Sequence, residues 1–101
     1  MKVYLLIHET YTCSDNDFYF DIKTFQSKQS AMNYLKLLKE CILEEILHSL
    51  KIKNIEELEY LFETTDIIYD YQNNNDHFFI DIYDEGSDCL RILEQDVMNF
   101  E

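Results

Sequence analysis

A long amphipathic segment in the middle of the chain places the strongest constraint on its fold. Between residues 28 and 50, apolar side chains recur three and four positions apart, the spacing that puts them on one face of an α-helix. These residues are Ala31, Tyr34, Leu35, Leu38, Ile42, Ile46 and Leu50. Ser27 is the predicted N-cap, because its hydroxyl can accept a hydrogen bond from the first turn. We expect a helix of about 22 residues, long enough to run across a β-sheet.

Three further leucines, Leu37, Leu43 and Leu47, broaden the apolar face of this helix. A helix that is apolar over so wide an arc is expected to contact something on a second side. The candidates are another helix or a second copy of the chain, so these leucines are a predicted homodimer seam.

The first 25 residues are predicted to form a β-hairpin. Residues 3 to 8 are apolar at nearly every position, which is typical of an interior strand covered on both faces. Residues 10 to 17 are polar and are expected to form the turn. Phe18, Phe20 and Ile22 then alternate with polar residues, as in a strand with one apolar face.

The second half begins with a short helix and continues as strands. Asn54 with Glu57 three positions later resembles a capping box, and helical spacing follows to about residue 65. Residues 66 to 71 fit a strand or a continued helix, and β-branched and aromatic residues favour the strand. Residues 78 to 83 alternate as a strand between turns at 73–76 and 84–88, the second of which contains Gly86. Residues 89 to 98 are predicted to be a last strand, with a terminal helix as the alternative.

Together these elements predict a single α+β domain over residues 1–101. We expect an antiparallel sheet in the order ββααβββ, with one long and one short helix packed on one face. The chain has no Pro and one Gly, which argues against a flexible linker.

The compartment is predicted from the thiols and the apolar runs. Cys13, Cys41 and Cys89 are odd in number and far apart, which suits reduced thiols and a cytoplasmic location. No stretch reaches the roughly 18 to 20 apolar residues of a membrane span, and the apolar N-terminal run is shorter than that of a signal peptide. We therefore expect no membrane partner.

The net charge of −13 lies entirely in the second half of the chain. Residues 1–53 hold seven acids and seven bases, whereas residues 54–101 hold fourteen acids and one base, Arg91. A surface of one sign indicates the kind of partner rather than the fold. Few and offset basic residues disfavour direct nucleic-acid binding, because phosphate contacts need clustered Lys and Arg.

Catalytic and metal motifs are absent from the sequence. His8-Glu9 is most simply a strand-end histidine bonded to a neighbour rather than an acid–base pair. Asp15-Asn16-Asp17 lacks the later Gly and Glu of a calcium loop. No zinc-ligand spacing, phosphate loop or recognisable nucleophile with its base is present. Cys41 falls on the apolar helix and is most simply a core residue. We expect no cofactor, no metal and no enzymatic activity.

The acidic residues of the second half are the candidate binding site. Glu56, Glu59 and Glu63 share one helical face, and like charges at this spacing cost stability. The predicted partner-binding residues are Glu56, Glu57, Glu59, Glu63, Asp66, Asp70, Asp81, Asp84, Glu85 and Asp88. Such a face can attract a basic protein and occupy a site that normally holds nucleic-acid phosphates, or it can serve solubility alone.

Three segments carry a resemblance to known proteins. Residues 2–9 (KVYLLIHE), 20–28 (FDIKTFQSK) and 79–86 (FIDIYDEG) resemble small prophage and mobile-element proteins of AT-rich bacteria. In size and acidity the chain is also similar to phage-encoded inhibitors, anti-CRISPR proteins among them, several of which are nucleic-acid mimics. This resemblance implies inhibition of a nuclease or CRISPR effector. Small acidic immunity proteins and antitoxins, which neutralise toxins, are the alternative resemblance, and a homodimeric structural module is a further alternative.

Overall fold

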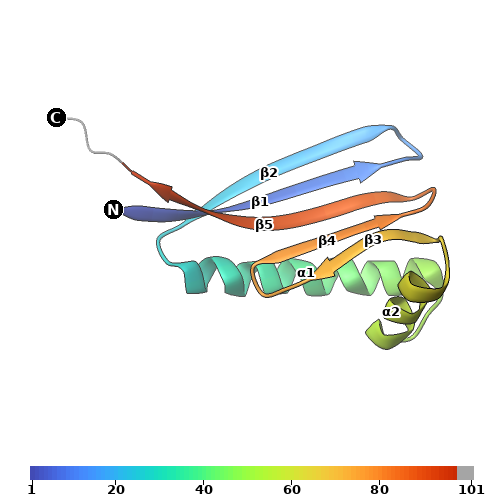
Figure 1. Cartoon of the computed structure of the whole chain (residues 1–101). Helices are drawn as coiled ribbons and strands as arrows, with labels where there is room; N and C mark the ends of the chain where they lie inside the picture. The colour runs from blue at the N-terminus through green and yellow to red at the C-terminus, as the bar shows by residue number, and fades with distance from the viewer. Residues whose placement is uncertain (98–101) are drawn as a thin grey trace.

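Five strands and two helices follow one another as β-β-α-α-β-β-β in the computed structural model, which describes residues 1–97 (Figure 1). The elements are β1 (Lys2–Thr12), β2 (Asp17–Phe25), α1 (Lys28–Leu50), α2 (Ile55–Thr64), β3 (Ile68–Asn73), β4 (His77–Ile82) and β5 (Gly86–Asp96). The predicted α+β class with an antiparallel sheet is confirmed.

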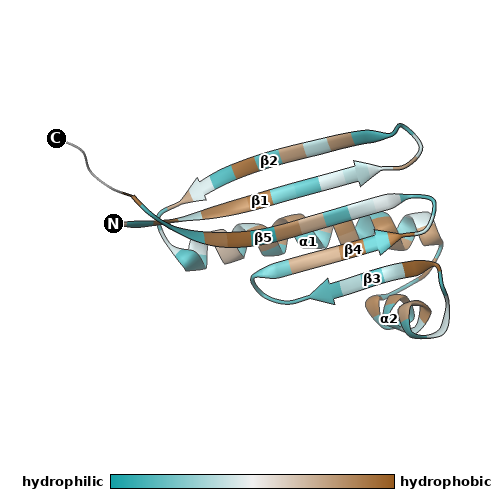
Figure 2. Ribbon diagram, turned by 45° about the horizontal axis from the view of Figure 1, so that its top comes forward, coloured by the Kyte–Doolittle hydropathy of each residue, from teal (hydrophilic) through white to brown (hydrophobic). Residues whose placement is uncertain are grey.

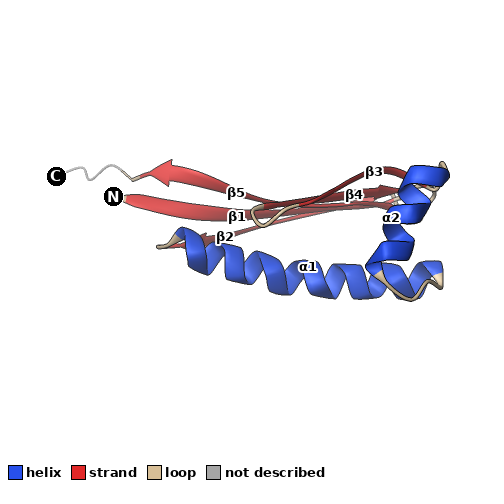
Figure 3. Cartoon of the chain, turned by 60° about the horizontal axis from the view of Figure 1, so that its bottom comes forward, coloured by secondary structure: helices blue, strands red, loops and turns tan. Residues whose placement is uncertain are grey.

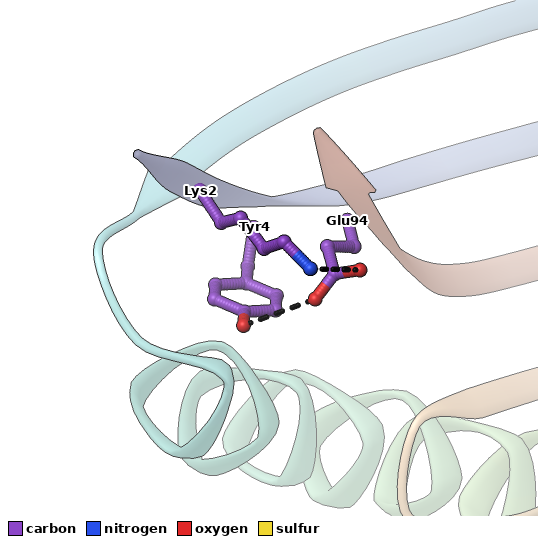
Figure 4. A network of polar contacts seen from close by, with 3 residues as sticks. All are labelled: Lys2, Tyr4 and Glu94. Carbon is purple, nitrogen blue, oxygen red and sulfur yellow. Dashed lines mark hydrogen bonds and ion pairs between the residues drawn. The ribbon is translucent and has the colours of Figure 1, made fainter. Parts of the chain in front are cut away.

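The sheet has the strand order β2-β1-β5-β4-β3, and every neighbouring pair is antiparallel. The first and last strands of the chain therefore lie side by side in its interior, in a register that pairs Leu6 with Ile92. Where the two ends of the chain meet, Glu94 accepts a hydrogen bond from the Tyr4 hydroxyl at 3.2 Å and one from the Lys2 ammonium at 3.4 Å (Figure 4). The Lys2–Glu94 ion pair is exposed, so it contributes little stability.

Helix α1 covers one face of this sheet, and the core lies between them (Figure 3). Its predicted N-cap is confirmed, because the Ser27 hydroxyl accepts a hydrogen bond from the Ser30 N–H at 3.1 Å. Leu35, Leu43 and Ile46 are buried against the sheet, which contributes Leu6, Ile68, Phe78, Ile80, Ile82 and Leu90. Alternate residues of each inner strand thus point at α1.

Helix α2 packs at the end of the sheet beside β3, with Leu58 fully buried (Figure 3). Its predicted cap is confirmed in its main feature, because the Asn54 amide oxygen accepts from the Glu57 N–H at 3.0 Å. The Glu57 carboxylate returns to the N–H of Lys53 rather than to that of Asn54 itself. Both side chains therefore bond to N–H groups around the start of the helix.

Both ambiguous segments are strands. Residues 68 to 73 form β3, which has a register shift between Ile68 and Asp70 where it pairs with β4. Gly86–Asp96 forms β5, and the last residue of the predicted strand 89–98 lies outside the described part of the chain.

Three expectations, one about the end of a strand and two about which surfaces are covered, were wrong. The first strand extends to Thr12, because Thr10 to Thr12 pair with β2 and β5 instead of forming a turn. Leu43 is buried and Leu47 is packed against the core, so only Leu37 of the predicted seam faces solvent. Strand β1 is interior in the sheet, but only one of its faces is covered by a helix of this chain (Figure 3).

Within residues 1–97, neither helix combines the length and the apolar character that crossing a membrane requires.

The burial of α1 leads to a stability prediction. Leu35 is 0% exposed, whereas Leu37, on the same helix, is 60% exposed. Leu35→Ala is expected to lower the free energy of unfolding by about 2–5 kcal/mol, because it leaves a cavity under the sheet. Leu37→Ala should change it by less than about 0.5 kcal/mol. Urea denaturation measures both, and equal effects would contradict the packing.

Gly86 leads to a second prediction. It has a φ of +129°, and a Cβ at this position would collide with the backbone carbonyl oxygen of Tyr11. Gly86→Ala should therefore lower the free energy of unfolding by roughly 2–4 kcal/mol, from strain and from separation of β5 from β1. The neighbouring Ser87→Ala is the control, for which denaturation should show less than about 0.5 kcal/mol.

Candidate functional site

The predicted acidic residues lie closest together in sequence on the outer surface of α2. Glu56, Glu59 and Glu63 are all exposed on it, and Tyr60 lies among them with 65% of its surface exposed. The opposite side of the helix carries Leu58 into the core. The predicted shared face of the three glutamates is therefore present, and it includes an aromatic ring.

Four of the other predicted residues already have polar partners. Glu57 caps its own helix, and the Asp70 carboxylate accepts from the N–H of Tyr71 at 2.8 Å. Glu85 accepts from the Ser49 hydroxyl at 2.7 Å. Asp88 is half-buried on the helix side of β5 and accepts from the Thr10 hydroxyl at 2.8 Å. Asp88 is thus a structural residue rather than part of an exposed acidic surface.

Asp66, Asp81 and Asp84, together with Asp70, lie at the same end of the sheet as α2. Asp70 and Asp81 are directly opposite each other across β3 and β4, on the face away from the helices. Asp66 precedes β3, and Asp84 lies in the turn after β4. Six of the ten carboxylates have no hydrogen-bond or ion-pair partner within residues 1–97; they are Glu56, Glu59, Glu63, Asp66, Asp81 and Asp84. We call these six the acidic end.

Exposed aromatic rings accompany the acidic end. The eight tyrosines of the chain favour a binding surface as a group, but the sequence does not show which of them lie beside the acids. Tyr69 and Tyr83 meet edge to face, with ring centroids 5.9 Å apart. With Asp66 and Ile67 they line a shallow depression of about 260 Å³. Desolvation, and then the neighbouring Tyr83, Asp81 and Asp66, raise the pKa of Tyr69.

A sequence signal for Tyr60 did exist. It lies off the apolar stripe of α2 and four residues after Glu56, which places it on the acidic face. No such signal existed for Tyr69 and Tyr83, because their contact depends on how β3 pairs with β4.

The His8-Glu9 pair is divided between the two faces of β1. The His8 Nε2 lies 3.0 Å from the Thr10 hydroxyl and 3.5 Å from the Asp88 carboxylate on the helix side. Glu9 points the other way and pairs with Arg91 at 3.1 Å. Because successive strand residues alternate, the two side chains cannot act on one substrate atom.

Within residues 1–97, neither the thiols nor the turn at Asp15-Asn16-Asp17 belongs to a recognisable catalytic or metal site. Cys13 and Cys41 are exposed, which corrects the expectation that Cys41 is core, and Cys89 is half-buried. In the part of the chain that the structure describes, no three His, Cys, Asp or Glu side chains are grouped to hold a metal ion. Asp17, which the sequence placed in the first turn, is the first residue of β2, and its carboxylate accepts from the N–H of Phe18.

The chain matches no family model, no curated protein and no solved structure. The resemblance to phage-encoded inhibitors thus stays a prediction. The geometry of the acidic end is what supports a functional proposal.

The three thiols are expected to react at different rates. Desolvation and the nearby charge of Glu9 raise the pKa of Cys89, which leaves less of the reactive thiolate at neutral pH. With a chromogenic disulfide reagent, Cys13 and Cys41 should react fast and Cys89 in a separate, slower phase. Cys89→Ser should remove the slow phase, and three equal rates would contradict the burial.

Proposed function

We propose that this protein is a non-enzymatic binding protein whose acidic end engages a basic, nucleic-acid-handling protein. The observation that carries the proposal is the unpaired state of the six carboxylates. Every ion pair of residues 1–97 involves strand residues elsewhere: Lys2–Glu94, His8–Asp88, Lys23–Asp21 and Arg91–Glu9.

Unpaired acids at helical spacing have an energetic cost. Glu56, Glu59 and Glu63 are neighbours on α2, and like charges at three- and four-residue spacing destabilise a helix by roughly 0.2–0.5 kcal/mol per pair. A cationic partner relieves that repulsion. It also adds steering, since a field of one sign accelerates the encounter with a surface of the opposite sign.

The exposed tyrosines add the apolar part of such an interface. Tyr60 lies between the glutamates of α2, and Tyr69 with Tyr83 borders Asp66. Tyr is a favoured interface anchor, and Arg stacks on aromatic faces while pairing with carboxylates. The acidic end therefore suits an Arg-rich groove of the kind that binds nucleic-acid phosphates.

Inhibition of a CRISPR effector and neutralisation of a nuclease toxin would both use this surface. The two differ in the identity of the basic protein and not in the chemistry of its recognition. The partner that binds distinguishes an anti-CRISPR-type inhibitor from an immunity protein or antitoxin.

Binding to a panel of CRISPR effectors and nuclease toxins, with duplex DNA as competitor, tests the proposal. The triple variant Glu56→Lys, Glu59→Lys and Glu63→Lys should weaken binding at least about tenfold at low salt. The control variant replaces three exposed glutamates of α1 by lysine, which changes the net charge by the same amount; they are Glu40, Glu44 and Glu45. It should weaken binding less than about threefold, because distant charges are screened.

Two results would contradict the proposal. One is wild-type affinity that does not change with salt or with DNA competitor. The other is an equal loss in both triple variants, which would show that total charge matters and the position of the charge does not.

A further inference from the structure

Three large apolar side chains of β2 lie on the side of the sheet away from the helices. Phe18, Phe20 and Ile22 are 60%, 50% and 45% exposed. They pair with Tyr11, Glu9 and Ile7 of β1. The next residue along β1, Leu6, points the opposite way, into the core under α1, so these three pairs lie on the uncovered side of the sheet. Two charged residues of β2, Asp21 and Lys23, lie on the helix side and form an ion pair with each other at 3.8 Å.

The same apolar surface continues onto the two central strands. Val3, Leu5 and Ile7 of β1 are on this side of the sheet, although Ile7 is only 5% exposed, and Leu93, paired with Leu5, extends the surface onto β5. No helix lies on this side of the sheet (Figure 3), and Figure 2 shows hydrophobic bands along all three strands. We call these residues the open face: Val3, Leu5, Ile7, Phe18, Phe20, Ile22 and Leu93.

This arrangement is the reverse of an ordinary solvated sheet. An antiparallel sheet with one wet side places polar residues on that side and apolar residues on the core. In β2 the hydrophobic alternation is strong, yet it is directed at solvent. No helix within residues 1–97 covers this surface (Figure 3), and large exposed apolar patches mark interaction surfaces.

The absence of net charge on the open face of β1, β2 and β5 favours a second copy of the chain as its partner. Within β1, β2 and β5, its only charged side chains are Glu9 and Arg91, which neutralise each other at 3.1 Å. The chain as a whole carries −13. A basic partner drawn to this protein would therefore bind at the acidic end and not here. A neutral apolar surface is complementary to itself.

We propose that the open face is the interface of a homodimer, in which the sheets of two copies pack face to face. Strands β1 and β5 have eleven residues each and β2 has nine, so the surface of these three strands covers roughly 500 Å² in projection. Stable interfaces begin near about 600 Å² of accessible surface per partner, and side chains expose more area than their projection. Sheets packed in this way interdigitate their inner side chains.

Other dimer arrangements leave the open face in water. Pairing through the free edge of β2 would extend the sheet and cover no apolar side chain. A seam on α1 has only Leu37 of the predicted leucines exposed. The face-to-face dimer is also separate from the acidic end, so it does not rest on the proposed function.

Two neighbouring residues of β2 allow a matched test. Phe20 is 50% exposed on the open face and Tyr19 is 55% exposed on the opposite face of the same strand. Phe20→Glu should raise the dimer dissociation constant roughly a hundredfold, because it buries an unpaired charge in the interface. Tyr19→Glu adds the same charge on the opposite face, so this variant should keep the dimer mass of the wild-type protein. Sedimentation equilibrium measures mass, and circular dichroism checks that both variants are folded.

Cys89 provides a second measurement without a new probe. It pairs with Phe79 and Glu9 across the sheet, on the open side. Its reaction with the disulfide reagent should slow further as protein concentration drives dimerisation, and Phe20→Glu should abolish this dependence on concentration. The exposed Cys13 and Cys41 are internal controls and should react at a constant rate.

Salt separates this proposal from the one for the acidic end. Two copies that carry −13 each repel one another, so the dimer should tighten as salt shortens the Debye length from its value of about 8 Å at physiological strength. Binding of a basic partner should weaken instead. A monomer at all salt concentrations, or a dimer that Phe20→Glu leaves intact, would overturn the face-to-face interface.

Discussion

The pairing of β1 with β5 is the interaction on which the rest of the structure depends. The β1–β2 hairpin and the β3–β4–β5 meander each form from neighbouring segments, and only this ladder joins them into one sheet. It pairs Lys2 with Asp96 and Thr12 with Gly86, from opposite ends of the chain. Closing so long a loop costs conformational entropy. Burial of Leu6 and Leu90 beneath α1 offsets that cost, so helix packing and strand pairing stabilise each other.

The two surfaces left exposed by this sheet differ in physical character. The acidic end is formed by α2 and the strands beside it, where unpaired carboxylates lie among tyrosines. The open face lies over β2, β1 and β5, where apolar side chains surround one neutral ion pair. Under the two proposals, salt would weaken the binding of a basic partner at the acidic end and would strengthen self-association through the open face. The two proposed interactions would therefore use separate surfaces of one small protein.

Local sequence patterns predicted most of the elements, because their signals involve residues close in the chain. Ser27 and Asn54 cap their helices as expected, since a cap needs only a side chain and the next turn. The environment of single residues was less predictable. Asp88 was assigned to the acidic surface, but it bonds to Thr10, a residue 78 positions away. Cys41 was assigned to the core and is exposed, because it lies on the side of α1 that faces away from the sheet.

The sequence by itself determined the helices, the alternation of the strands and the excess of acid in the second half, since each is a property of spacing or composition. It showed that Phe18, Phe20 and Ile22 share a face, and the structure confirms this. Only the tertiary structure decided which way that face points. The direction depends on the register of β2 against β1 and on the side to which α1 crosses, and a shift of one residue would reverse it. Long-range packing decides both.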